Sequence, residues 1–264
     1  MLMLSKIREI YQYRELLSVF SKKELKVKYK NSALGFLWSF INPLVLAVVY
    51  TIIFSIVFPN PVKNFPLFLI IGLIPWNFFT ISIATCSGSI IANSNLVKKV
   101  FFPREIIPLS VVFSGLTNFL LEMAVILVIL LLFGFNFLPY IPVFILAVLL
   151  QVIATIGFGL IFASLTVYFR DIEQLINILL LIWFFATPIV YDLSVVAAKS
   201  SSAALFLKIV NPMTSIILLY RQALFYRDWP SLQLLVYAIG GSLTIFTVGY
   251  LVFQKLSPNF AKEV

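Results

Sequence analysis

Six long apolar blocks constrain this chain more than any other feature of its sequence. A helix needs about 20 mostly apolar residues to cross a bilayer. In agreement, 62% of the 264 residues are hydrophobic and 11% are charged, against about 25% charged in an average soluble domain. We therefore expect an all-α polytopic membrane protein with six transmembrane helices. The blocks are residues 34–58, 67–91, 109–133, 141–169, 172–191 and 232–254.

The positive charges are distributed unevenly between the two sides that these blocks define. Of the 19 Lys and Arg residues, 14 lie before the first block, in the loops after the second and fourth blocks, or in the tail. Because basic residues mark the cytoplasmic side, both termini are predicted to be cytoplasmic. The same placement argues against nucleic-acid binding. The chain has no His and one Cys, which excludes His-based catalysis, a His-ligated metal site and a disulfide framework.

Three segments flank or interrupt the predicted transmembrane domain, which covers residues 34–254. Residues 1–33 form a cytoplasmic lead-in in which 4–20 read as an amphipathic helix that lies in the headgroup plane; residues 24–30 alternate in the manner of a strand. The segment 192–231 contains an apolar stretch of about 14 residues, too short to span, and is predicted to form re-entrant gate helices outside. Residues 255–264 form a short cytoplasmic tail.

Four local motifs lie at the edges of the predicted spans. They read KYKNSALGFLW at 28–38, NLVKKVFFPREIIP at 95–108, YFRDIEQLI at 168–176, and PIVY at 188–191 with NPM at 211–213. Together they resemble the permease subunits of bacterial polysaccharide ABC exporters of the type-2 superfamily, with the O-antigen and lipopolysaccharide export permeases the most similar. That resemblance implies an inner-membrane homodimer that exports a lipid-linked polysaccharide with two separate ATPase subunits. It implies no enzymatic activity for this chain.

The loop 92–108 is the place where the resemblance puts the coupling helix that contacts the ATPase. The sequence has no Gly-Lys dipeptide, so a phosphate-binding P-loop is absent; we expect no cofactor here, and ATP and Mg²⁺ on the partner. Aromatic and basic residues in one loop favour a protein contact, whereas an ordinary basic inside loop would explain the lysines but not two exposed phenylalanines. The candidate coupling residues are Leu96, Lys98, Lys99, Phe101, Phe102, Arg104 and Glu105.

A sliding sugar chain favours flat aromatic surfaces and scattered polar groups. Tyr50 and Phe54 lie deep in the first block, and Trp183, Phe184 and Tyr191 follow in the fifth. Aromatic belts at the membrane interfaces are the alternative explanation for these rings. Polar residues inside the spans complete the candidate path, although hydrogen bonds between helices would explain them equally well. They are Asn118, Glu122, Gln151 and Thr155.

The basic end of the lead-in is a candidate cytoplasmic entrance, formed by Lys28, Tyr29, Lys30 and Trp38. Lysines there attract an anionic lipid headgroup, or they hold the N-terminus inside. Two other functions stay open. An ABC permease for small hydrophobic molecules or drugs fits the same spans and coupling loop. A membrane glycosyltransferase would need an exposed carboxylate outside, and only Asp192 and Asp228 are available there.

Overall fold

A computed structural model describes residues 9–30, 32, 34–35, 37–53, 64–132 and 134–264. Every regular element among them is a helix, which confirms the all-α prediction. The elements are α2 (Arg14–Tyr29), α3 (Leu37–Ile52), α4 (Phe65–Ala92), α5 (Ser94–Lys99), α6 (Ile106–Leu132), η2 (Leu138–Tyr140), α7 (Ile141–Tyr168), α8 (Ile172–Ala186), α9 (Leu193–Lys199), α10 (Ser201–Val210), α11 (Pro212–Arg221), η3 (Gln222–Tyr226), α12 (Leu232–Leu256), η4 (Ser257–Asn259) and α13 (Phe260–Glu263).

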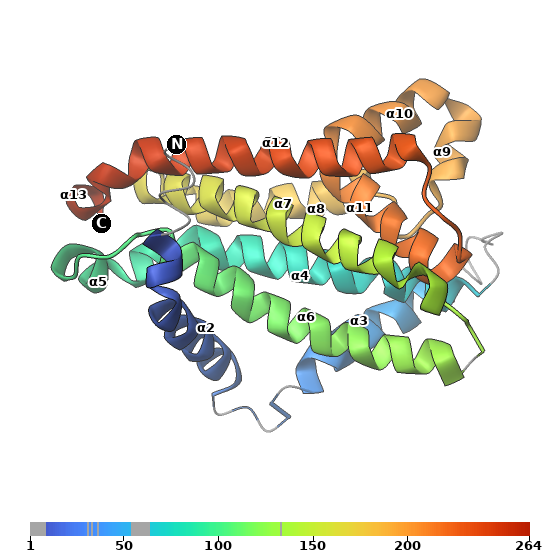
Figure 1. Cartoon of the computed structure of the whole chain (residues 1–264), viewed down its shortest axis with the longest axis horizontal. Coiled ribbons are helices and arrows are strands. Elements are labelled where there is room, and N and C mark those ends of the chain that lie inside the picture. The colour runs from blue at the N-terminus through green and yellow to red at the C-terminus, as the bar shows by residue number, and fades with distance from the viewer. Residues whose placement is uncertain (1–8, 31, 33, 36, 54–63, 133) are drawn as a thin grey trace.

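Among the described residues, four helices are long and apolar enough to cross a membrane: α4, α6, α7 and α12. They run side by side along the long axis of the molecule (Figure 1), and α7 packs against the other three. A fifth candidate is α10 together with α11 and η3, a pair bent by 100°. The structure therefore supports four or five spans, and the predicted six are not confirmed.

The two other predicted spans correspond to shorter helices. The described part of the first is the 16-residue α3, and residues 54–58 of that block lie outside the described residues. The fifth corresponds to the 15-residue α8. It ends at Ala186 because Thr187 precedes a proline and adopts an extended conformation, with φ −107° and ψ 134°; a residue before proline avoids the helical region.

The N-terminal helix extends beyond residue 20, where the prediction ended it, and residues 4–8 of the predicted range lie outside the described residues. Residues 9–12 are helical and α2 continues to Tyr29, so the strand-like alternation at 24–30 belongs to a helix. On its inner side, Leu17 and Phe20 pack against a hydrophobic cluster at the end of the bundle. Because α2 also packs along α6, this segment is joined to the helical bundle.

Two long helices, α7 and α12, approach each other closely at Gly157 and Gly249. A Cβ atom built on Gly157 would lie 2.6 Å from the carbonyl oxygen of Ile245. A Cβ atom on Gly249 would overlap the backbone carbonyl of Gly157. Small residues allow two helix backbones to touch in a membrane, so these glycines hold α7 and α12 together.

The segment between α8 and α12 is anchored by one buried arginine. Arg221 is completely buried, and its guanidinium lies 3.5 Å from the ring centre of Phe68 on α4. Nη1 donates to the carbonyl of Pro188 at 2.5 Å, and Nη2 donates to the carbonyl of Ile189 at 2.6 Å. These carbonyls are left free where α8 ends, so Arg221 ties α11 to both α4 and the end of α8.

Candidate functional site

The predicted coupling loop contains the short helix α5 at one end of the bundle (Figure 1). Lys98, Lys99 and Val100 are exposed, Leu96 is half-buried, and the side chain of Phe101 is fully exposed at 101%. An aromatic ring in water beside two cations is unusual for a structural loop. It is the surface expected of a residue that inserts into a partner protein.

The neighbouring Phe102 points the other way. It is 9% exposed, and its ring centre lies 6.2 Å from that of Phe20 on α2. The expectation of two exposed phenylalanines is therefore wrong. The chain is extended at Val100, with φ −121° and ψ 136°, and successive side chains of an extended segment point to opposite sides. Phe101 faces out and Phe102 secures the loop to the bundle.

Arg104 and Glu105 also face the bundle. Arg104 Nη1 donates a hydrogen bond to the carbonyl of Ser257, just beyond α12. Glu105 is buried and lines a largely apolar cavity of about 410 Å³ that Arg14 and Tyr250 also line. Both residues are placed to hold the loop against the N-terminal segment and α12.

The lead-in helix is joined to the coupling helix by polar contacts. Lys23 Nζ donates to Asn93 Oδ1 at 3.0 Å, directly before α5 begins. Asn93 Nδ2 donates in turn to the carbonyl of Ser89 on α4 at 2.8 Å. A displacement of α5 would therefore also displace α2 and α4.

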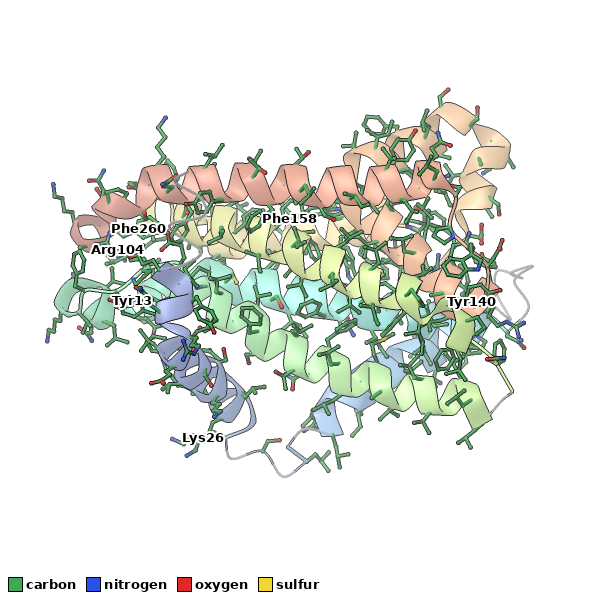
Figure 2. All side chains as sticks on the ribbon, in the orientation of Figure 1. Tyr13, Lys26, Arg104, Tyr140, Phe158 and Phe260 are labelled. Atoms are coloured by element: carbon green, nitrogen blue, oxygen red, sulfur yellow. The ribbon has the colours of Figure 1, made fainter. Side chains whose placement is uncertain are left out.

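The C-terminal tail is a part of this site that the sequence analysis missed. Phe260 is completely buried, with ring centres 5.4 Å from Phe253 and 6.4 Å from Tyr168. Tyr168 also donates from its hydroxyl to the carbonyl of Leu256 at 3.0 Å. Figure 2 shows Phe260 and Arg104 close to one another at this end. The two phenylalanines at 253 and 260 were the sequence feature that could have indicated that the tail packs against the end of α12.

We expect Phe260→Ala to destabilise the folded protein by about 3 kcal/mol, because a fully buried aromatic ring is lost and a cavity remains. Thermal unfolding in detergent measures this. Lys262→Ala, at an exposed position two residues away, is the matched control and should leave the midpoint unchanged. Equal midpoints for Phe260→Ala and the unmodified protein would show that the tail does not hold this end together.

The polar candidates for the substrate path are buried inside a single copy of the protein. Gln151 Nε2 donates to the carbonyl of Pro75 at 2.6 Å, and its Oε1 accepts from the Tyr220 hydroxyl at 2.7 Å. This arrangement matches the alternative of hydrogen bonds between helices. Thr155, Asn118 and Glu122 are also buried.

The aromatic candidates divide between α8 and the first block. Trp183 packs edge-on against Phe158, 4.8 Å between ring centres, and Phe184 is buried against Trp76 at 5.9 Å. Tyr191 donates from its hydroxyl to the carbonyl of Phe185 at 3.1 Å. Phe185 itself is 60% exposed and was not singled out from the sequence. The side chain of Tyr50 and all of Phe54 lie outside the described part of the chain.

The entrance candidates lie around the end of α2. Lys28 and Tyr29 belong to its last turn, and their side chains are outside the described part. Lys30 caps the helix and is exposed, and Trp38 at the start of α3 is 46% exposed. The four residues thus flank the connection from α2 to α3, and their role stays a prediction.

The opposite end of the molecule has a polar cavity of about 760 Å³ between α9, α10, η3 and α12. Asp192 caps α9 by accepting from Ser194 N at 2.7 Å, and it accepts a hydrogen bond from the Tyr226 hydroxyl. Burial raises the pKa of the Asp192 carboxyl, but the bonds from Tyr226 and Ser194 outweigh burial and hold the pKa below its usual range.

This lowered pKa gives a pH-dependent prediction. A carboxylate with a lowered folded-state pKa contributes stability above its unfolded pKa of about 3.9, and that stability is lost as pH falls through the folded-state pKa. Asp192→Asn should therefore unfold at a lower temperature than the unmodified protein at pH 7, and this difference should be smaller at pH 3, below the unfolded-state pKa. If the thermal midpoints of Asp192→Asn and the unmodified protein differed by the same amount at both pH values, this prediction would be contradicted.

Comparisons with known proteins agree on one group of relatives. The sequence model of the family described as "ABC-2 type transporter" matches residues 15–225. The O-antigen export system permease protein RfbA of Myxococcus xanthus is 35% identical over 263 residues, 99% of this chain and 100% of the relative. A protein of the same name from Klebsiella pneumoniae is 38% identical and covers 94% of each chain. The polysialic acid transport protein KpsM of Escherichia coli is 26% identical over 76% of this chain and 78% of that protein.

Proposed function

This chain belongs to the ABC-2 type transporter family as a multi-pass permease subunit rather than an enzyme, and we propose that it exports a lipid-linked polysaccharide of the O-antigen type. Two relatives that align over nearly the whole chain are named as O-antigen export permeases, and this supports the choice of cargo. The proposed location is the bacterial inner membrane with both termini in the cytoplasm. In support, the start of α2 and the C-terminus lie at the same end as α5 (Figure 1).

The observation that carries the proposed mechanism is the fully exposed ring of Phe101. A separate ATPase subunit binds ATP and Mg²⁺ and receives Phe101 in a groove, while Lys98 and Lys99 face acidic groups at its rim. Buried aromatic anchors with charged rims are typical of strong protein contacts. The motion that ATP drives in the ATPase subunit is transmitted to this chain through α5.

From α5 the motion has two physical routes into the bundle. One runs through the Lys23–Asn93 hydrogen bond to α2. The other runs through Arg104 and the buried Phe260 to the end of α12. Both routes begin with a direct hydrogen bond from the loop or its flanking residue. The outer segment 192–231, which Arg221 ties to α4, acts as the gate on the far side.

The path for the sugar lies between two copies of the chain. Within one copy, Trp183 and Phe184 are occupied by aromatic partners. The apolar side chains that α8 presents outward are available to line a shared path or to meet the second copy. They are Leu175, Ile178, Leu179, Leu181, Ile182 and Phe185.

Stimulation of ATP hydrolysis tests the choice of cargo. The permease is reconstituted with its ATPase in vesicles, and a polyprenyl-linked glycan or a panel of hydrophobic drugs is added. The proposal expects hydrolysis to rise with the glycan lipid and to stay at its basal rate with the drugs. A rise with drugs alone would instead support a permease for small hydrophobic molecules.

A further inference from the structure

A second cavity lies between α2, α4 and α6, away from the coupling loop. Its volume is about 290 Å³, at the lower end of small-molecule sites. That volume suits one sugar ring or a glycerol-sized group, and excludes a chain. The lining residues are Glu24, Val27, Ile81, Ser82, Thr85, Val111, Ser114, Gly115 and Asn118.

Two polar atoms at this cavity are buried without a hydrogen-bond partner within the described part of the chain. They are Ser82 Oγ and Asn118 Nδ2, on residues that are 1% and 4% exposed. Buried polar groups in folded proteins are nearly always satisfied, so such a pair requires an explanation. Both residues line the same cavity, and a ligand there would satisfy both.

One glycine, Gly115, determines how closely α6 and α4 approach beside this cavity. A Cβ atom at Gly115 would lie 2.6 Å from Ser82 Oγ and 3.2 Å from the ring of Phe78. Gly115 therefore lets α6 approach α4 closely while the Ser82 hydroxyl stays at the cavity wall. A larger residue at this position would force the Ser82 side chain to move.

The polar groups select the chemistry of the occupant. Asn118 Nδ2 is a donor and needs an acceptor, whereas the Glu24 carboxylate needs a donor. A hydroxyl group is both. An ammonium group has no lone pair that could accept a hydrogen bond from Asn118. A phosphate would be repelled by the Glu24 carboxylate. The Glu24 side chain is 24% exposed, and its Oε1 lies 3.8 Å from Lys23 Nζ.

The position of the cavity indicates access from the membrane. Val111 and Asn118 are five and twelve residues beyond the start of α6 at Ile106, which is about 8 and 18 Å at 1.5 Å per residue. The cavity thus extends from the headgroup level of the leaflet on the α5 side into its interior. Glu24 and Val27 of α2 line one side of it.

We propose that this cavity binds the uncharged, hydroxyl-bearing end of a membrane lipid headgroup and leaves the lipid phosphate outside, with Asn118 donating to a hydroxyl oxygen and Glu24 accepting from a hydroxyl proton. The proposal goes beyond the export function, because such a lipid would be held whether or not cargo moves. Two molecules carry this chemistry in the same leaflet. One is a resident glycerol-headed lipid, and the other is the first sugar of a lipid-linked glycan.

The test is lipid retention by the full-length chain, measured by native mass spectrometry from detergent with added phosphatidylglycerol or phosphatidylcholine. We expect the unmodified protein to retain phosphatidylglycerol and to release phosphatidylcholine, which has no headgroup hydroxyl. Asn118→Leu and Glu24→Leu should each lower retained phosphatidylglycerol at least fivefold. Thr117→Val is the matched control, because the exposed Thr117 bonds only to its own helix.

Thermal unfolding keeps the test valid if one variant folds poorly. Phosphatidylglycerol should raise the midpoint of the unmodified protein and of Thr117→Val, but not that of Asn118→Leu. Equal retention by Asn118→Leu and the unmodified protein, or equal retention of both lipids, would overturn the proposal. A polyprenyl-linked sugar that displaces phosphatidylglycerol identifies the glycan as the occupant, and one that leaves it in place identifies the resident lipid. Neither result depends on export.

Discussion

Phe101→Asp should weaken binding of the ATPase subunit by about 30-fold to 700-fold. A central aromatic anchor contributes about 2–4 kcal/mol at a protein interface, and 1.4 kcal/mol corresponds to a tenfold change in affinity. The ring of Phe101 is fully exposed, so its replacement removes no internal contact and should leave the fold intact. Pull-down of the purified permease in detergent with increasing amounts of ATPase subunit measures the change.

The comparison variants separate binding from folding. Leu138→Asp replaces an exposed apolar residue at the opposite end of the bundle and should bind the ATPase like the unmodified protein. Phe102→Asp would place a charge in the cluster with Phe20 and unfold this end, so loss of binding there says nothing about contact. A monodisperse Phe101→Asp variant with undiminished affinity would remove α5 and its loop as the ATPase contact.

Gly249→Val should prevent stable assembly of the bundle. A side chain at Gly249 overlaps the Gly157 carbonyl, a backbone atom that cannot rotate away. Overpacking of a core typically costs about 1–3 kcal/mol; here α7 and α12 must separate, so we expect at least about 3 kcal/mol. Thermal unfolding in detergent and the yield of monodisperse protein both report the loss.

Gly240→Val is the matched control for this substitution. It lies on the same helix, and a Cβ atom there meets no atom within 4 Å. Its midpoint should stay close to that of the unmodified protein. Wild-type stability of Gly249→Val would mean that α7 and α12 are farther apart in the membrane than this packing requires.

Hydropathy predicted the long helices well. The blocks at 67–91, 109–133, 141–169 and 232–254 correspond to α4, α6, α7 and α12, with ends within three residues. Burial in lipid requires continuous apolar helices, and this requirement leaves a strong signal in the sequence. The fifth block was predicted to run to residue 191, although Pro188 could have indicated the earlier end of α8 at Ala186.

The orientation of individual side chains could not be predicted from the sequence. Phe101 and Phe102 are chemically identical neighbours, and only the extended backbone between α5 and α6 decides that one faces water and the other Phe20. Gln151 was a plausible sugar contact until its partners, Pro75 and Tyr220, were found on distant segments. Long-range contacts of this kind leave no local pattern.

The tail and the small cavity were missed for the same reason. Phe260 belongs to a ten-residue tail that composition describes as polar, yet it closes the cluster beneath α5. Ser82, Asn118 and Glu24 lie on three separate helices, and only the small size of Gly115 brings the first two together. Sequence analysis identified Asn118 as a polar residue inside a span but not the residues that lie opposite it.

Transport in sealed vesicles tests the central claim most directly. Vesicles contain the permease alone, the ATPase subunit alone, or both, and translocation of a polyprenyl-linked glycan is measured with and without ATP. The account predicts movement of the glycan only with both subunits and ATP, and none with Phe101→Asp in place of the unmodified permease. Nucleotide hydrolysis or glycan movement by the permease alone would contradict it.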